Sequence, residues 1–331
     1  MKREKVISII LLLMIMAGVM AGCGGGGGDK TGVEDEKRYD QLLVEGSTLG
    51  GIGYSLLSGM VEIATEVLPD VTLTLEATAG YKENAVRMSK GVGDIGIVGH
   101  DDAIDLYNGA GEYGNAKETF LTMFPAHTLD WNIIVRKDSG IETIWDLEGK
   151  RVNKQPKGGA SEAVSTVLLD ALGIKHQDFY MPHTEAAEAM MSNSIDAHIV
   201  MGAPAQFREM ATREPLVVID LPDEDIEKIL EKMPFLTKTT FPAGLYYPGN
   251  DDIQTVNLWA PVLVHKDIPE DLVYELVKGV YENIGAMKAA HPSGGDMKPE
   301  QVLEMNVPLH PGSLKYFKEM GIDIPDKLIH K

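Results

Sequence analysis

The chain's strongest ligand-binding chemistry lies in a loop rich in glycine and hydroxyl residues, residues 46–53 (GSTLGGIG). Ser47 and Thr48 supply hydroxyl donors, and the glycines allow a ligand to approach the backbone closely. A helix is predicted to begin at Ile52, and helix beginnings present unpaired N–H groups with a partial positive charge. Such a loop can bind an anionic oxygen without a cationic side chain.

The spacing of these glycines excludes the two common phosphate-binding motifs. A P-loop requires lysine after its last glycine, but Ile52 follows Gly51. A dinucleotide fingerprint that uses Gly51 and Gly53 requires a third glycine where the chain has Leu56,. The loop therefore predicts a small anionic ligand rather than a nucleotide.

Three further loops repeat this chemistry, at residues 78–80 (TAG), 157–161 (KGGAS) and 202–204 (GAP). Each follows a predicted strand, and open α/β sheets bind ligands beyond the carboxyl ends of their strands. Any one of these loops could be an ordinary turn. Likewise, Lys157 could be a solvated surface lysine and Tyr54 a core residue. Four such loops together nevertheless favour a shared site. The predicted ligand-binding residues of these loops and the helices that follow them are Ser47, Thr48, Gly50, Tyr54, Thr78, Gly80, Asn84, Lys157, Gly159, Ser161, Gly202 and Pro204.

Strands and helices are predicted to alternate along most of the chain, which indicates βαβ units and largely parallel sheets. The predicted strands are 41–45, 71–76, 94–98, 131–136, 151–154, 195–200 and 257–264. The predicted helices are 52–67, 81–90, 101–107, 161–172, 186–192 and a C-terminal helix with an apolar stripe from Leu272 to Met287, Pro269 in its first turn and Asp267 as its N-cap,.

The alternation restarts midway, and residues 94–98 (DIGIV) and 196–200 (DAHIV) are similar. We therefore predict an α/β fold with two lobes, each a mostly parallel sheet flanked by helices. The expected first lobe is discontinuous (39–133 and 258–331), the second is 134–257, and the hinge strands lie near 131–136 and 255–264.

The N-terminus is predicted to be an export signal followed by a lipid anchor. A basic start precedes an apolar run, 6–16, that is short of the roughly 20 residues a membrane span needs,. Cys23 follows Met20-Ala21-Gly22, which resembles a bacterial lipobox; the alternative is a plain secretory signal with an incidental cysteine. We expect a signal peptide at 1–22 and a glycine-rich tether at 23–38, and hence an extracytoplasmic protein anchored to the membrane through Cys23.

The charge balance argues against a nucleic-acid partner. The chain carries a formal charge of −20, and loss of the signal would remove three basic residues and one acidic one, Glu4. A strongly negative protein repels nucleic acid. Since Cys23 is the only cysteine, no internal disulfide can form,.

An exported enzyme is the main rival from another class. Nine histidines could indicate a metal site or a hydrolase, but the HExxH and GxSxG motifs of such enzymes are absent from the sequence,. The histidines fall on unrelated predicted elements, His198 lies in a predicted buried strand, and Ser161 has no base nearby in the sequence. The expectation is a binding protein without catalytic activity, cofactor or metal.

Several sequence blocks resemble the TAXI-type solute receptors of TRAP transporters. These are residues 46–54 (GSTLGGIGY), 91–98 (GVGDIGIV), 137–141 (KDSGI) with 146–152 (DLEGKRV), 242–244 (PAG) and 308–312 (PLHPG). The resemblance covers nearly all of the chain after the tether, in order. It implies a type II periplasmic-binding fold, a sodium-coupled TRAP permease as partner and a small carboxylate such as glutamate, glutamine or 2-oxoglutarate as ligand.

The departures from the family pattern concern the expected pocket. Gly53 stands where a bulkier residue is common, and Gly158 to Ser161 replace a GSGT pattern. Gly99-His100-Asp101 follows a strand after which the family often has Gln or Ser, which adds His100 to the predicted ligand-binding residues. An acid there could pair with a ligand amine and so favour an amino acid. An ABC-importer receptor or a sensor-coupled binding protein on the same fold is the alternative, and a monomer is expected.

Overall fold

The computed structural model describes residues 39–331 except 158–159, 203–204 and 245–250. The predicted signal, Cys23 and tether therefore lie outside the described residues, as do Gly159 and Pro204. Residues 39–331 form one compact unit.

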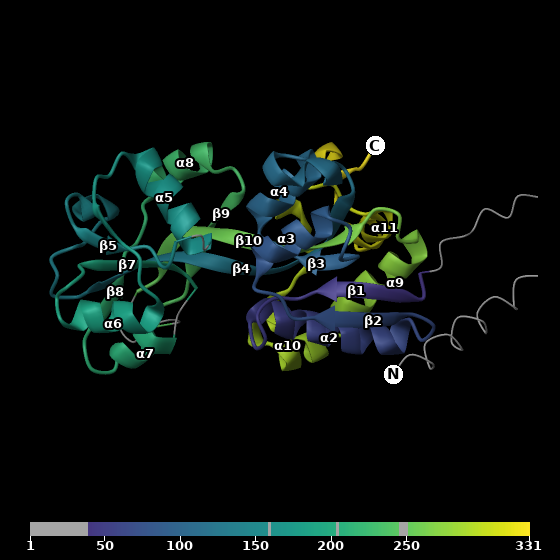
Figure 1. Ribbon diagram of the computed structural model, residues 1–331, viewed down its shortest axis with the longest axis horizontal. Coiled ribbons are helices and arrows are strands. Elements are labelled where there is room, and N and C mark those ends of the chain that lie inside the picture. Colours follow the sequence, from purple (N-terminus) through teal and green to yellow (C-terminus); the bar gives the residue numbers. More distant parts are fainter. Residues whose placement is uncertain (1–38, 158–159, 203–204, 245–250) are drawn as a thin grey trace, which may run out of the picture. The chain divides into compact units, whose positions relative to one another are not determined.

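Two sets of three parallel strands make up most of the sheet (Figure 1). The strands of the first set are β1 (Gln41–Glu45), β2 (Thr72–Glu76) and β3 (Ile95–Ile97). Those of the second set are β5 (Arg151–Asn153), β6 (Gln177–Phe179) and β7 (Ala197–Met201). Within each set the carboxyl ends of the strands lie at the same edge.

Two long antiparallel strands, β4 (Phe120–Arg136) and β10 (Ile253–His265), connect the two sets and run side by side in Figure 1. The strand order is β2-β1-β3-β10-β4-β7-β5-β6, with β8 (Leu216–Val218) paired to β4 and β9 (Leu236–Phe241) paired to β10. The sheet is mixed because β4 and β10 run antiparallel to their neighbours.

Helices flank both sets of strands, which confirms the α/β class. The α-helices are α2 (Ile52–Val67), α3 (Tyr81–Ser89), α4 (His100–Asn108), α5 (Ala160–Leu172), α6 (His183–Met191), α7 (Ala205–Met210), α8 (Asp223–Lys232), α9 (Glu270–Glu282), α10 (Ile284–Ala290) and α11 (Pro311–Glu319). The 3₁₀ helices are η1 (Gly111–Ala116), η2 (Ile144–Leu147), η3 (Pro292–Asp296), η4 (Pro299–Glu304) and η5 (Asp326–Leu328). We call β1–β3, α2–α4 and the chain from α9 onward the first lobe, and β5–β9 with α5–α8 the second lobe.

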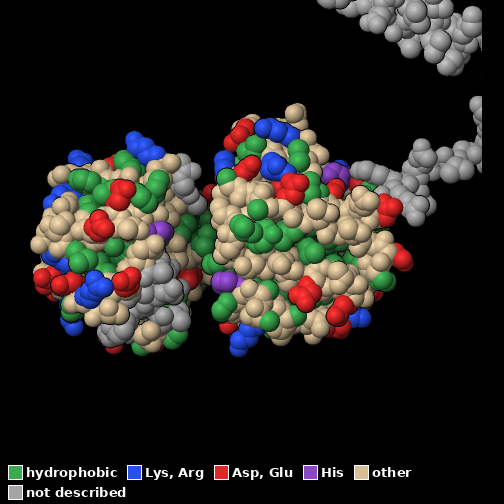
Figure 2. Space-filling view, turned by 60° about the horizontal axis from the view of Figure 1, so that its bottom comes forward, with side chains coloured by type: hydrophobic (Ala, Val, Ile, Leu, Met, Phe, Trp, Pro, Cys, Tyr) green, Lys and Arg blue, Asp and Glu red, His purple; other side chains and the backbone are tan. Residues whose placement is uncertain are grey.

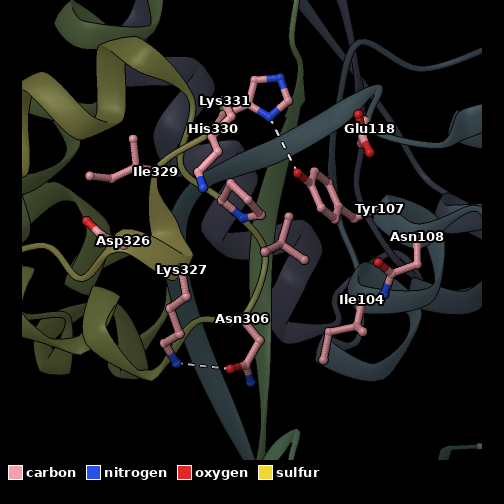
Figure 3. A pocket seen from close by; sticks show the side chains of 12 residues that line it. Ile104, Tyr107, Asn108, Glu118, Asn306, Asp326, Lys327, Ile329, His330 and Lys331 are labelled. Atoms are coloured by element: carbon pink, nitrogen blue, oxygen red, sulfur yellow. Dashed lines mark hydrogen bonds between the residues drawn. The ribbon is translucent and has the colours of Figure 1, made fainter.

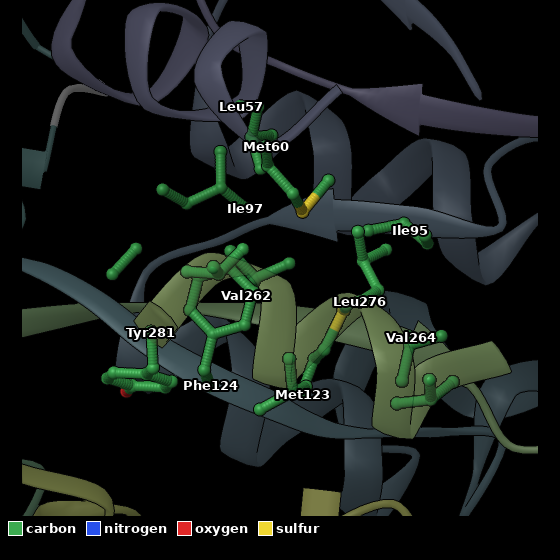
Figure 4. Close-up of a cluster of buried hydrophobic side chains, with 14 of the residues drawn as sticks. Leu57, Met60, Ile95, Ile97, Met123, Phe124, Val262, Val264, Leu276 and Tyr281 are labelled. Carbon is green, nitrogen blue, oxygen red and sulfur yellow. The ribbon is translucent and has the colours of Figure 1, made fainter. Parts of the chain in front are cut away.

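Each lobe has its own hydrophobic core. In the first lobe, apolar side chains of α2, β3, β10, β4 and α9 meet, including Met60, Ile97 and Leu276 (Figure 4). In the second, α5 and α8 pack on β4 and β7. Leu258 and Trp259, adjacent residues of β10, belong to different cores, so the chain passes from one lobe to the other at this point.

Two details of the prediction are wrong. Strand β4 begins at Phe120 rather than Trp131, because Pro125, which argues against a strand in the sequence, lies opposite Pro261 at a bulge of the ladder,. Helix α9 begins after an N-cap at Pro269 rather than Asp267, and the apolar stripe continues into α10 after a break at Asn283.

Candidate ligand-binding site

The loop between β1 and α2 is held by hydrogen bonds that Ser47 accepts. The Ser47 side chain is 5 % exposed, and its Oγ accepts a hydrogen bond from the Tyr54 backbone N–H at 3.0 Å. The Ser47 carbonyl accepts from the Thr78 N–H at 3.1 Å, which ties this loop to the one after β2. Ser47 thus satisfies one backbone N–H in the first turn of α2 and joins two of the predicted ligand loops. Tyr54 is half-buried against Gly46.

The tip of the same loop faces solvent. Thr48 and Gly50 are exposed, and the Leu49 side chain is 77 % exposed although it is apolar. Gly50 has a φ of +79°, which favours glycine,. Thr48 to Gly50 is therefore the part of this loop that a ligand or another surface can reach directly.

A carboxylate of the protein itself, that of Glu83, already accepts a backbone N–H at the start of α3. Glu83 Oε2 accepts a hydrogen bond from the Ala79 N–H at 2.5 Å, and Thr78 Oγ1 accepts from the Gly80 N–H at 3.3 Å. Gly80 is the N-cap, with a φ of +142°. The backbone amides that the sequence analysis assigned to an anionic ligand are thus partly occupied by the protein's own side chains.

Asn84 holds the first lobe's strand ends together. It is fully buried, and its Nδ2 faces the carbonyl oxygens of Glu45 at 3.2 Å, of Ile97 at 2.7 Å and of Gly46. Its Oδ1 accepts from the Thr78 hydroxyl at 2.6 Å. Both ends of the amide are used within the protein, so Asn84 positions the loops that follow β1 and β3.

A tyrosine–histidine pair, which the sequence analysis missed, lies under the start of α2. The Tyr81 hydroxyl is 2.6 Å from His127 Nε2, and His127 Nδ1 is 3.1 Å from the Thr128 carbonyl. That carbonyl assigns the ring proton to Nδ1, so the tyrosine donates to Nε2. A Cβ on Gly53 would lie 2.7 Å from the Tyr81 ring, so the absent side chain at Gly53 makes room for the tyrosine.

The second lobe presents Lys157 at the end of β5. Lys157 is exposed, and its Nζ lies 4.4 Å from the centre of the Tyr180 ring. The nearby Lys154 is buried and paired with Asp178 at 2.8 Å. Lys154 is therefore committed to structure, whereas Lys157 can meet an anionic ligand.

Ser161 and Gly202 join the second lobe's loops to each other and to β4. Ser161 Oγ accepts a hydrogen bond from the Met201 N–H at 3.1 Å. Gly202, with a φ of +89°, donates its N–H to the Asp130 carbonyl at 2.7 Å. The carboxyl ends of β5 and β7 are thus connected to the strand that leads back to the first lobe.

A second missed cluster lies at the same edge and centres on Gln155, whose φ is +76°. Its Nε2 is 3.0 Å from His183 Nδ1 and 3.1 Å from His198 Nε2. His198 is fully buried, stacks on Phe207 at 4.4 Å, and burial lowers its pKa to about 3. A non-glycine residue held at positive φ is a costly conformation that is concentrated at functional sites.

The His198 ring is unsuited to metal binding. Asn153 Oδ1 accepts from the Met181 N–H at 2.6 Å, which makes its Nδ2 the donor to His198 Nδ1 at 2.8 Å. His198 Nδ1 therefore accepts a hydrogen bond and has no free lone pair for a metal ion, and its Nε2 faces the Gln155 amide and His183,. Among the described residues, no group of three or more His, Cys, Asp or Glu side chains lies close enough to hold a metal ion.

His100, predicted to contact ligand, is instead buried between the lobes. It is the first residue of α4 and 1 % exposed. Its Nδ1 is 3.1 Å from the Phe235 carbonyl, and its Nε2 accepts from the Asn306 N–H at 3.2 Å. Burial lowers the pKa of His100 to about 4. The adjacent Asp101 remains near the carboxyl end of β3, where burial raises its pKa to about 6.

A pocket of about 430 Å³ lies in the first lobe, apart from these loops (Figure 3). It is lined by α4, the segment 306–308 and the C-terminal residues, and Tyr107 is 3.4 Å from His330 Nδ1 across it. None of the residues predicted to bind ligand lines this pocket.

The described acidic and basic side chains are scattered among one another over the face that Figure 2 presents. The negative charge of the chain is not gathered into one field on this face. Recognition of a charged ligand would therefore depend on the local groups of the site.

Two lobes joined by paired crossing strands, with polar loops at the carboxyl ends of parallel strands, define the two-lobed architecture of periplasmic binding proteins. Residues 46–321 match the NMT1-like family, and the chain belongs to that family.

The solved structures of similar fold have low sequence identity to the chain. XAC2383 from Xanthomonas citri bound to ATP is 12 % identical, with a TM-score of 0.51 over 85 % of this chain and 95 % of that one. The probable amino-acid ABC transporter extracellular-binding protein ytmK from Bacillus subtilis is 14 % identical, with a TM-score of 0.49 over 78 % and 100 %. The periplasmic aliphatic sulphonate binding protein SsuA from Escherichia coli is 14 % identical, with a TM-score of 0.47 over 78 % and 77 %. In the described part of the chain, no helix combines the length and hydrophobicity that crossing a bilayer requires.

Proposed function

We propose that the chain is an extracytoplasmic solute-binding protein that captures a small carboxylate by closing its two lobes and delivers it to a membrane transporter. Family membership and the two-lobed fold support a binding protein. The observation that carries the proposal is the position of polar loops at the carboxyl ends of parallel strands in both lobes, after β1 and β2 in the first and after β5 and β7 in the second.

The chemistry of the reachable groups favours an anion that also carries an amine. Thr48 offers a hydroxyl at the exposed loop tip, and Lys157 offers a cation from the second lobe. Asp101 follows β3 at the same edge as the loops of the first lobe. A carboxylate that meets Lys157 and an amine that meets Asp101 together describe an amino acid such as glutamate or glutamine.

The sequence blocks shared with TAXI-type receptors favour a sodium-coupled TRAP permease as the partner, with a lipidated Cys23 as the anchor and a monomeric receptor. Transport in reconstituted vesicles distinguishes this partner from an ABC importer. Uptake that follows a sodium gradient supports the TRAP permease, and uptake that requires ATP instead supports the alternative.

Calorimetry against glutamate, glutamine, 2-oxoglutarate and simple dicarboxylates tests the ligand class. Replacing Lys157 with methionine keeps the aliphatic stem and removes the charge, and should weaken carboxylate binding about tenfold, the loss expected for one charge-assisted hydrogen bond. Lys175→Met is the matched control, because Lys175 is exposed at the opposite end of the same sheet, before β6.

Small-angle scattering supplies the second measurement. A ligand that binds both lobes should reduce the radius of gyration, since the closed state must make more contacts with it than the open state. Absence of binding across the whole panel would contradict the ligand class, and equal losses for Lys157→Met and Lys175→Met would remove Lys157 from the site.

A further inference from the structure

We propose that His100 is a third, non-covalent hinge point, which restricts the relative rotation of the lobes to a single axis. The inference rests on the lobe closure of the proposed function and assigns His100 the role of a positioning residue instead of a ligand contact.

His100 connects segments from both lobes through one ring. On the second-lobe side, Nδ1 meets the carbonyl of Phe235, whose neighbours Met233 and Leu236 belong to the second lobe's core. On the first-lobe side, Nε2 accepts the N–H of Asn306, and Asn306 is in turn held by Lys327 Nζ at 3.1 Å (Figure 3). Asn306 Nδ2 also reaches the Pro234 carbonyl at 3.5 Å.

This junction lies beside the strands that cross between the lobes. Leu236, the residue after Phe235, pairs with Leu258 of β10, next to the point where that strand changes cores. At the other end, a Cβ on Gly99 would contact the Leu258 side chain at 3.8 Å. The start of α4 therefore packs directly on the hinge strand.

Two adjacent strands do not by themselves restrict the rotation of one lobe against the other to a single axis. Backbone torsion changes within β4 and β10 can both bend and twist the connection. A third attachment, displaced from the strand pair, permits rotation only about the line that joins it to the strands. Imidazole suits this role because a rigid ring carries one donor and one acceptor in fixed directions.

The ring is held in the neutral form that this role needs. Burial is the largest cause of its lowered pKa, and Lys327 also disfavours a positive charge on it. Asp101 and Asp102 are the charged neighbours on α4 itself, and residues 233–236 of the second lobe carry no charge. The Nδ1–H tautomer is fixed by the Phe235 carbonyl on one side and the Asn306 N–H on the other.

Distances between spin labels on the two lobes test the inference without any ligand. In the full chain with Cys23→Ser, labels are attached at Glu66→Cys on α2 and Asp170→Cys on α5, both of which are exposed. His100→Gln keeps an acceptor near the Nε2 position and loses the donor to Phe235. We expect its interlobe distance distribution to be about twofold broader than that of the parent chain, because bending and twisting both become available.

Two further variants separate the hinge role from general stability. His100→Asn retains a donor near the Nδ1 position and should restore most of the parent's narrow distribution. His310→Gln is the matched control, since His310 is equally buried and its side-chain bond, to the Gly312 N–H, stays within the first lobe. It should leave the distribution unchanged even if it lowers the melting temperature.

An unchanged distribution in His100→Gln would overturn the inference, as would equal broadening in His310→Gln. These results are independent of the ligand panel. If no solute binds but His100→Gln broadens the distribution, the hinge point stands and the proposed function fails.

Discussion

Replacing Asn84 with aspartate should destabilise the protein by ~3 kcal/mol or more at neutral pH, the cost of a buried charge without a counter-charge. The Asn84 amide nitrogen faces the carbonyl oxygens of Glu45, Gly46 and Ile97. The isosteric carboxylate would place an oxygen against three others of the same partial charge. Urea unfolding at pH 7 measures this loss of stability. Ligand affinity should also fall, because the loops after β1 and β3 lose the hydrogen bonds of Asn84 that hold them together.

The pH dependence of this variant provides an internal check. As the pH falls, the buried carboxyl of Asn84→Asp takes up a proton and regains a donor, so its deficit should shrink. Asn115→Asp is the control, because Asn115 is exposed and a charge there remains solvated. A loss in Asn84→Asp no larger than that of Asn115→Asp would show that the hydrogen bonds of Asn84 to the three carbonyls contribute little to stability.

Acid should destabilise the protein over a window set by four buried histidines. Burial lowers the pKa of His100, His127 and His310 to about 4 and that of His198 to about 3, from an ordinary value of 6.5. Below pH 6.5 the unfolded chain takes up protons that the folded chain does not, so the free energy of unfolding falls. The loss levels off once the pH is below the folded values. Each ring with a folded pKa of about 4 contributes ~3 kcal/mol to it, and His198 contributes ~5 kcal/mol,.

One carboxyl acts in the opposite direction within the same window. Burial raises the pKa of Asp101 to about 6 from 3.8, so the folded chain binds this proton more readily, and acidification stabilises the folded state by ~3 kcal/mol,. The net expectation is a decline of several kcal/mol between pH 6.5 and 4 in urea titrations. His310→Gln should reduce the slope, and a flat profile through this window would contradict the assignment.

The sequence indicated the elements better than it indicated the uses of their side chains. Helix α2 has the predicted bounds because its apolar residues repeat at helical spacing, whereas the early part of β4 was hidden by Pro125. Ser47 and Thr78 do follow strand ends, and Asn84 reaches those ends from α3, but their polar atoms bond to one another and to the backbone. A sequence pattern locates a hydroxyl at a helix start without revealing whether its partner is a ligand or a neighbouring loop.

The side-chain clusters that the sequence did not reveal were all missed for the same physical reason. Tyr81 pairs with His127, and Gln155 with His183 and His198, across separations that only the folded sheet brings together. His100 was assigned to the ligand because it follows a strand at the expected edge. Its partners Phe235 and Asn306 come from distant parts of the chain, so no local signal pointed to the lobe junction.

The Glu83 carboxylate on the Ala79 amide means that the start of α3 contains a tethered competitor. A group attached to the same helix is present at a high effective concentration, so a free anion gains from this amide only after it displaces Glu83. Simple inorganic anions, which offer one contact, are disfavoured at this position relative to a solute that both lobes hold at once. The Glu83 carboxylate therefore lowers the affinity of this position for free anions and favours ligands large enough to contact the second lobe as well.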